Sequence, residues 1–203
     1  MKLYTSIGSN PKVVRMFLAE KGVTIPSVTV DIHSGENREP AFLQKNPMGQ
    51  VPVLELDDGT TITEVTAICE YLEEIYPETP LLGTDPTERA LTRMWSRRLD
   101  LAILQPMASG YRYGEGLAFF SSRMRCIPAA APDLKRIAQD GLAWLEGVMS
   151  DRSFVVGDRI SLADIMLYAN VAFFARLGQP LDASHASVHH WLDAMRQRAS
   201  ARA

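Results

Sequence analysis

The feature that most constrains this chain is a proline inside a run that otherwise reads as a strand. Residues 46–76 are NPMGQVPVLELDDGTTITEVTAICEYLEEIY. The first part is apolar and extended, Gly59 follows two aspartates as hairpin turns prefer, and helical spacing begins at Val65. Proline cannot donate a hydrogen bond to a sheet, so Pro52 requires a special position. A cis Val51–Pro52 bond meets that requirement, because it turns the Val51 backbone outward to pair with something other than the protein.

The residues that precede this segment predict a strand, a helix and a second strand. They cover about residues 2–6, 11–21 and 28–32, and Gly22 ends the helix. Two strands joined through a helix form a parallel pair with a right-handed crossover. With the hairpin and the helix that follow it, we expect an α/β thioredoxin-like domain over residues 1–76.

The second half of the chain predicts only helices. Residues 77–84 are rich in proline and glycine and are expected to form a linker, and residues 85–203 an all-α bundle. Pro106 is expected to kink or end the first helix, and Ser161 to Asp164 has the form of a capping box. The expected helices cover about residues 85–103, 132–149, 161–178 and 186–198.

Composition narrows the functional classes. The 203 residues carry a net charge of −3, which argues against nucleic acid as a partner. No apolar run has the length of a membrane span, and the first ten residues lack the apolar core of a signal peptide, so we expect a cytoplasmic protein away from membranes. Cys69 and Cys126 form no disulfide framework, and the histidines show no metal-binding spacing, so no metal is expected.

Several motifs resemble the cytosolic glutathione transferases. The run GENREPAFLQKNPMGQVP, residues 35–52, resembles the phi- and theta-like members without a gap, and residues 64–68, EVTAI, resemble the start of their next helix. In the second half, LDLAILQPM and RISLADIMLY are most similar to a bacterial and fungal branch of the family. The resemblance implies an N-terminal glutathione-binding domain and a C-terminal substrate domain.

The resemblance also implies how glutathione is bound. Val51, ahead of Pro52, pairs its main chain with the cysteine of glutathione, and Glu64 meets the γ-glutamyl group. Gln50 contacts the glycyl end. The family usually has Ser or Thr where this chain has Val65, which removes a hydroxyl contact, although the Val65 N–H at a helix N-terminus still binds an anion.

Two neighbouring residues complete the implied glutathione contacts. Arg38 is a charge-assisted donor for the glycyl carboxylate. Asn37 stands where those enzymes have a glutathione-contacting histidine, so it keeps hydrogen bonding but not charge.

The chemistry requires a thiolate. Lowering a thiol pKa of about 8.5 by about two units needs roughly 2.7 kcal/mol of preferential stabilisation of the anion. One hydrogen bond to a charged group supplies about 1.5–3 kcal/mol. Ser9 lies where serine-type transferases carry their activating residue, and Asn10 is the alternative donor. The competing interpretation is that either residue only caps the helix before Pro11.

Tyr111, Arg112 and Tyr113 lie where the family builds its electrophile site. They are candidates for the walls of that site and for orienting a water or an electrophile, and the alternative is a solvated helix end. The expected partners are glutathione as cosubstrate and a small hydrophobic electrophile, with a homodimer as the assembly that the resemblance implies.

The favoured function is transfer of the glutathione thiolate to small electrophiles. A glutathione-dependent peroxidase, reductase or isomerase on the same fold is an alternative, although the isomerases carry a Ser-Ser-x-Cys run where this chain has Ser9-Asn10-Pro11-Lys12. A non-catalytic interaction module of the same fold is the third hypothesis.

Overall fold

The computed structural model describes residues 1–203, which form two compact units. The first unit contains Met1–Leu82 together with Ala199–Ala203, and the second contains Gly83–Arg198. No helix of either unit has the length and apolar character needed to cross a membrane.

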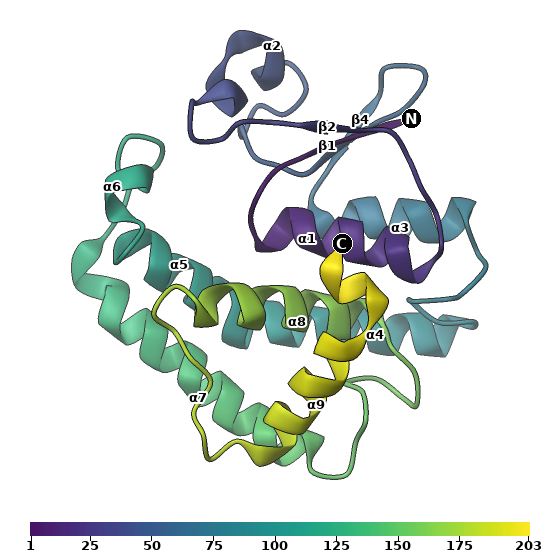
Figure 1. Cartoon of the computed structure of the whole chain (residues 1–203), viewed down its shortest axis with the longest axis vertical. Helices are drawn as coiled ribbons and strands as arrows, with labels where there is room; N and C mark the ends of the chain where they lie inside the picture. Colours follow the sequence, from purple (N-terminus) through teal and green to yellow (C-terminus); the bar gives the residue numbers. More distant parts are fainter. The chain divides into compact units, whose positions relative to one another are not determined.

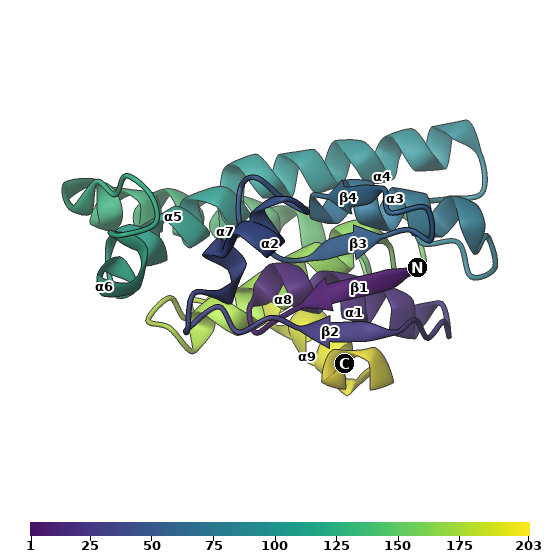
Figure 2. The ribbon, with the colours of Figure 1, turned by 90° about the horizontal axis from the view of Figure 1, so that it is seen from above.

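The first unit is built on a four-stranded mixed sheet, which Figure 2 shows face on. Its strands lie in the order β2-β1-β3-β4; β1 and β2 are parallel, and the other pairs are antiparallel. The strands are β1 (Lys2–Thr5), β2 (Ser27–Thr29), β3 (Val53–Glu55) and β4 (Thr61–Thr63). This is the predicted thioredoxin-like topology, so the fold class is confirmed for this half of the chain.

Helices cover both faces of this sheet (Figure 1). Helices α1 (Ser9–Glu20) and α3 (Val65–Ile75) lie on one face, and η1 (Glu36–Arg38) and α2 (Pro40–Leu43) lie on the other. The helix α1 begins two residues earlier than predicted, because Gly8 with φ 126° ends the turn after β1. The second strand is shorter than the predicted range 28–32: β2 is an exposed edge strand, and the buried Val30 follows it.

Lys21 holds the residues after α3: its Nζ lies 2.6 Å from a carboxylate oxygen of Glu73 and donates to the carbonyl of Tyr76 at 2.8 Å.

The first unit includes both ends of the chain. The last turn, η4 (Ala199–Arg202), packs on α1, where Lys12 donates to the Ala201 carbonyl at 2.8 Å. The return of the last residues to the first unit was not predicted. The limits of the linker at residues 77–84 stay a prediction.

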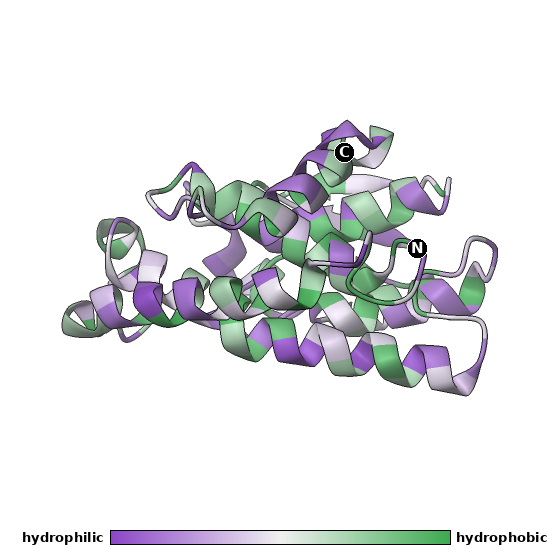
Figure 3. Ribbon diagram, turned by 90° about the horizontal axis from the view of Figure 1, so that it is seen from below, coloured by the Kyte–Doolittle hydropathy of each residue, from purple (hydrophilic) through white to green (hydrophobic).

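The second unit is helical throughout, as predicted. Its main helices are α4 (Pro86–Leu99), α5 (Gln105–Tyr113), α7 (Ala131–Met149), α8 (Leu162–Ala175) and α9 (Ala186–Gln197). Three short elements were not predicted: η2 (Asp100–Leu104), α6 (Leu117–Phe120) and η3 (Pro128–Ala130). Hydrophobic and hydrophilic residues alternate along many of the helices (Figure 3), as amphipathic packing requires.

Pro106 neither ends nor sharply breaks its helix. The wide π turn η2 precedes Pro106 and joins α4 to α5. Because proline has no N–H, one backbone carbonyl of the preceding turn lacks its usual hydrogen-bond partner, and the π turn lets the helical chain continue at this point. Gly141 of α7 packs against this turn: a Cβ at Gly141 would lie 2.5 Å from the Ala102 carbonyl oxygen. The close approach of α7 to η2 therefore requires glycine.

The predicted capping box is present at the start of α8. Asp164 is fully buried, and it accepts from the backbone N–H and the hydroxyl of Ser161 at 3.0 and 2.7 Å. It also accepts from the Val155 N–H at 2.8 Å and the Trp191 indole at 3.0 Å. Burial raises the pKa of Asp164, and these donors oppose the shift. Asp164 therefore joins α8, α9 and the loop before α8 in one folding element.

Candidate functional site

The loop that leads into Pro52 is held by a buried asparagine that the sequence analysis did not single out. Asn46 is 4% exposed. Its Nδ2 donates to the Gln50 carbonyl at 2.8 Å, and its Oδ1 accepts from the Met48 N–H at 3.0 Å. Its own carbonyl accepts from the Gly49 N–H at 2.8 Å. Residues 46–50 thus form a closed turn with one side chain at its centre.

Asn37 and Arg38 brace the same loop from η1. Asn37 is 5% exposed, and its Nδ2 donates to the Gly49 carbonyl at 2.6 Å. Arg38 donates from Nη1 to the Met48 carbonyl at 3.2 Å. Gly49 has φ 61°, and a Cβ there would lie 2.8 Å from the Asn37 carbonyl oxygen, so only glycine fits. Both predicted glutathione contacts are therefore engaged with the protein backbone, Asn37 from the interior and Arg38 at the surface.

Val51 and Pro52 follow this loop. The Val51–Pro52 peptide bond is cis. The half-buried Val51 side chain packs on a cluster of Val30, Phe42 and Val53. The Val51 N–H and carbonyl make no hydrogen bond within the chain, and β3 begins only at Val53. Val51 is thus anchored by its side chain while its main chain stays free to pair.

Glu64 has a backbone conformation that non-glycine residues seldom adopt. It has φ 70° and ψ 126°, it is exposed, and it immediately precedes α3. Such a conformation costs about 1–3 kcal/mol, and residues that keep it concentrate at functional sites. No side chain caps α3, so the N–H groups of Val65, Thr66 and Ala67 have no hydrogen-bond acceptor in the chain. This end of α3 presents a carboxylate beside free amide donors.

Ser9 and Asn10 form the first turn of α1 instead of capping it. Gly8 is the N-cap residue, and no side chain caps this end. Ser9 is 9% exposed, its hydroxyl makes no hydrogen bond within the chain, and the amides of Ser9 and Asn10 are also without acceptors. The competing interpretation of Ser9 or Asn10 as a helix cap is therefore wrong.

A tyrosine and an arginine near β1 have other tasks. The Tyr4 hydroxyl donates to Glu55 at 3.0 Å, and its ring packs on Phe42, so the partly buried Tyr4 serves the packing of the first unit. Arg15 of α1 donates to the Thr5 hydroxyl at 2.8 Å and fixes the turn between β1 and α1. Burial lowers the pKa of the Arg15 guanidinium. The sequence did not reveal this role for Arg15.

The register of the sheet brings the predicted residues of the first unit to one edge. Val53 pairs with Tyr4 of β1 and with Thr63 of β4. The carboxyl ends of β1 and β4 therefore lie beside the amino end of β3. Ser9 follows β1, Val51 precedes β3 and Glu64 follows β4, so all three emerge at the same edge.

In the second unit, Tyr111, Arg112 and Tyr113 end α5 and are all partly buried. The Tyr111 ring packs on Phe120 and Phe174, with centroids 6.1 and 5.7 Å away. The Arg112 guanidinium lies 5.8 Å from the centre of the Phe120 ring and has no ion-pair partner. Burial lowers the pKa of Arg112, against the influence of Tyr113 and Cys126. The predicted alternative of a solvated helix end does not describe this aromatic cluster.

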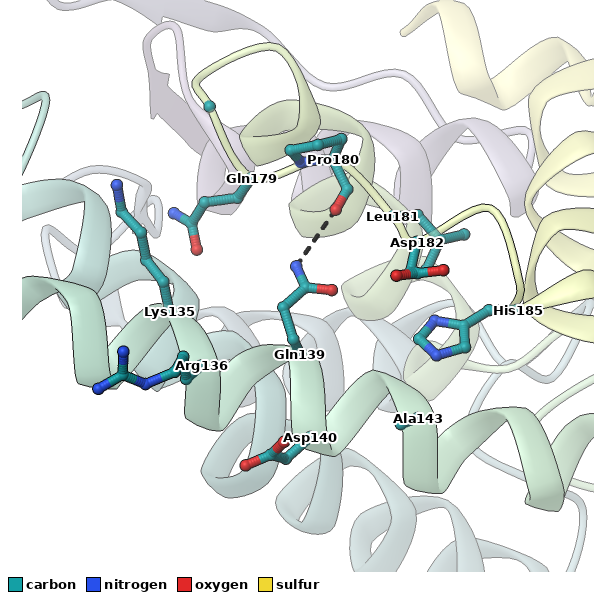
Figure 4. Close-up of a pocket in the computed structure, with 11 residues that line it drawn as sticks. Lys135, Arg136, Gln139, Asp140, Ala143, Gln179, Pro180, Leu181, Asp182 and His185 are labelled. Atoms are coloured by element: carbon teal, nitrogen blue, oxygen red, sulfur yellow. Dashed lines mark hydrogen bonds between the residues drawn. The ribbon is translucent and has the colours of Figure 1, made fainter.

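The second unit also has an open pocket of about 510 Å³ between α7 and the loop that joins α8 to α9 (Figure 4). Gln139 donates across it to the Pro180 carbonyl at 3.2 Å. The two cations that line it, Lys135 and Arg136, are paired with Glu115 and Asp133. None of the predicted site residues lines this pocket. No group of three or more histidine, cysteine or acidic residues in the chain is placed to hold a metal ion.

A thioredoxin-like unit with a free main-chain edge beside its proline, followed by an all-helical unit, defines the class of the glutathione transferases. Family models for the N-terminal and C-terminal domains of glutathione S-transferase match residues 9–75 and 128–194. The chain belongs to the glutathione S-transferase family.

Relatives that are similar over most of the chain support this family assignment. Glutathione S-transferase 2 of Saccharomyces cerevisiae is 31% identical over 97% of this chain and 85% of its own length. The maleylacetoacetate isomerase of Pseudomonas aeruginosa is 34% identical over 90% of this chain and 85% of its own length. Among solved structures, Gtt2 of S. cerevisiae superposes with a TM-score of 0.91 at 32% identity, covering 100% of this chain and 99% of that one.

Proposed function

We propose that the protein is a glutathione transferase that conjugates the glutathione thiolate to small electrophiles. The observation that carries the proposal is the register of the first unit, which brings Ser9, Val51 and Glu64 to one edge of the sheet. Each offers a group that the chain itself leaves unused: a hydroxyl, a main-chain pair and a carboxylate. A γ-glutamyl tripeptide with a central thiol has the complementary groups.

The binding roles follow from that chemistry. Val51 donates its N–H and accepts at its carbonyl, as a strand would, so it pairs with the cysteine residue of glutathione. Glu64 meets the γ-glutamyl ammonium, and the free amides at the start of α3 hold the γ-glutamyl carboxylate, which suits a helix N-terminus. Gln50 and Arg38 meet the glycyl end. Asn37 is used inside the loop, so we assign it to holding Gly49 and not to direct contact.

The reaction requires only the thiolate and an electrophile. The Ser9 hydroxyl donates a hydrogen bond to the glutathione sulfur. The free amides of Ser9 and Asn10 lie at the positive end of the α1 dipole and stabilise the thiolate further. The thiol proton leaves to solvent, and the sulfur attacks the electrophilic carbon. A C–S bond forms while the leaving group takes the displaced electron pair. The aromatic cluster around Tyr111 and Arg112 supplies the apolar wall for that electrophile. We expect a cytoplasmic homodimer, as in the family.

A variant of Ser9 tests this assignment. In Ser9→Ala the bound thiol loses one charge-assisted hydrogen bond, so its pKa rises by about 1–2 units and kcat/KM for a chloronitrobenzene electrophile falls about 10–100-fold at neutral pH. The Kd for glutathione changes less than threefold. Calorimetry measures the Kd, and the ultraviolet absorbance of the thiolate measures the pKa of the bound thiol. Asn10→Ala is the matched variant, and a larger loss there would move the role to Asn10.

A second candidate is an isomerase, which the similarity to the P. aeruginosa maleylacetoacetate isomerase favours. The Ser9-Asn10-Pro11-Lys12 run differs from the Ser-Ser-x-Cys run that the isomerases carry at this place. An assay that follows cis–trans isomerisation of maleylacetoacetate separates the two activities. Glutathione binding without either activity would favour the third hypothesis, a non-catalytic interaction module of the same fold.

A further inference from the structure

We propose that Asn46 is a positioning residue that orients and polarises the Val51 N–H for its hydrogen bond to glutathione. The inference rests on the proposed function for its ligand, but the orientation of the peptide is a property of the free protein. Asn46 does more than close a turn, because its side chain holds the peptide group that carries the Val51 N–H.

The Asn46 side chain bonds the same peptide unit that carries the Val51 N–H. Its Nδ2 donates to the Gln50 carbonyl at 2.8 Å, and that carbonyl carbon is bonded to the Val51 nitrogen. The Gln50–Val51 bond is trans, since the only cis bond is the next one. In a planar trans peptide the C=O and N–H point in opposite directions. Fixing the carbonyl toward the buried Asn46 therefore aims the Val51 N–H away from it.

The amide of Asn46 is itself fixed. Its Oδ1 accepts from the Met48 N–H at 3.0 Å, so reversing the amide would set a donor against a donor and an acceptor against an acceptor. Asn46 is 4% exposed, so its side chain is largely shielded from water. The orientation of the 50–51 peptide is thus set before any ligand arrives, which lowers the entropy cost of binding.

The bond also changes the donor strength of the Val51 N–H. A hydrogen bond accepted by a peptide carbonyl polarises the whole group, and chains of such bonds strengthen one another. The chain would run from the Asn46 amide through the Gln50–Val51 peptide to the cysteine carbonyl of glutathione. Asn37 bonds the preceding carbonyl, that of Gly49, and so this bond supports the loop one peptide earlier.

The test compares Asn46→Asp with Asn170→Asp. Asn46→Asp keeps the acceptor for the Met48 N–H, removes the donor to the Gln50 carbonyl and adds a charge, which the Asn170→Asp control adds as well. Asn170 is 5% exposed and donates from Nδ2 to the Met166 carbonyl at 2.9 Å, so its variant makes the same buried change inside α8. Asn46→Ala, which buries no charge, is the second variant if the aspartate does not fold.

Affinity is measured by calorimetry with S-methylglutathione, which has no thiol to titrate. We expect the Kd to rise about tenfold in Asn46→Asp and Asn46→Ala and to stay within twofold in Asn170→Asp. As the pH falls, the new carboxyl of Asn46→Asp becomes protonated and donates again, so its affinity recovers, whereas Asn46→Ala does not recover. Equal losses in Asn46→Asp and Asn170→Asp would overturn the inference.

The second readout needs no ligand. In protein labelled with ¹⁵N-valine, the Val51 amide signal shifts in Asn46→Asp and stays in place in Asn170→Asp, because only the first changes the bond on that peptide. An unchanged Val51 signal would overturn the inference even if affinity falls. If the wild-type protein shows no binding heat, the proposed function fails, and the Val51 signal still decides whether Asn46 sets this peptide.

Discussion

Two buried polar side chains organise the two units in opposite ways. In the second unit, Asp164 accepts from every donor around it, and the whole network ends within the protein. In the first unit, Asn46 makes hydrogen bonds to the loop backbone as far as the Gln50 carbonyl, and the N–H and carbonyl of Val51 that follow are left without partners. A closed network stabilises a fold, whereas a network that stops one peptide short leaves a binding edge. Changes at Asp164 should therefore cost stability, and changes near Val51 should cost affinity.

The largest expected effect is on the closed network. Asp164→Ala leaves several buried donors without an acceptor, so we expect the free energy of unfolding to fall by about 3–5 kcal/mol. Urea unfolding followed by circular dichroism measures this. Asp193→Ala, an exposed surface pair with Arg196, is the control and should change stability by less than about 0.5 kcal/mol. If Asp164→Ala costs no more than that control, or if its folded form loses glutathione affinity, the contrast between the networks fails.

Glu64 tests whether changes at the binding edge of the first unit lower glutathione affinity. Loss of a charge-assisted hydrogen bond to the γ-glutamyl end should raise the glutathione Kd about 10–100-fold in both Glu64→Ala and Glu64→Gly. Only glycine relieves the backbone at φ 70°, so Glu64→Gly should be about 1 kcal/mol more stable than Glu64→Ala.

Calorimetry and urea unfolding on the same two preparations give both numbers. A Glu64→Gly protein that binds glutathione normally would remove the carboxylate from the site.

Val65 allows the site to be improved. Val65→Ser adds a hydroxyl at the start of α3, where the helix already offers free amides, and one added hydrogen bond should lower the glutathione Kd about 3–10-fold. Val65→Ala keeps the amide and adds no hydroxyl, so its Kd should stay near that of the wild type. Weaker binding by the serine variant would place the γ-glutamyl carboxylate elsewhere.

The smallest effect concerns Glu146, which caps α9 from α7. It accepts from the N–H groups of Ser187 and Val188 at 2.9 and 3.0 Å, and these bonds lower its pKa. A lowered folded pKa adds stability above the unfolded pKa of about 4.3, and that stability is lost as the pH falls through the folded pKa. Glu146→Gln should therefore be less stable than the wild type at pH about 7, and the difference should shrink as the pH falls below the unfolded pKa of about 4.3. Thermal unfolding above and below that pKa checks this.

The sequence predicted those features that depend on local chemistry. The hairpin at Gly59, the capping box at Ser161 and the special position of Pro52 are each set by neighbouring residues, and the order of the elements along the chain predicted the thioredoxin-like fold class. The end of α1 was placed well, but its start was not, because the turn at Gly8 depends on a positive φ that the sequence did not disclose.

Features that depend on the folded shape of a loop or on distant contacts were missed. Asn46 looks like an exposed loop residue, and only the folded loop shows that its side chain turns inward. Asn37 was expected to contact glutathione, and only the folded loop shows that its Nδ2 donates to the Gly49 carbonyl. The π turn before Pro106 and the return of residues 199–203 to α1 likewise depend on packing between elements far apart in the sequence.

The central claim is that the main chain of Val51 pairs with glutathione. A crystal structure of the protein with reduced glutathione tests it most directly. We expect the cysteine residue of glutathione to pair with the N–H and carbonyl of Val51 at about 2.9 Å, with the γ-glutamyl end at Glu64. Glutathione seated elsewhere, for example in the pocket beside Gln139, with the Val51 main chain still free, would contradict it.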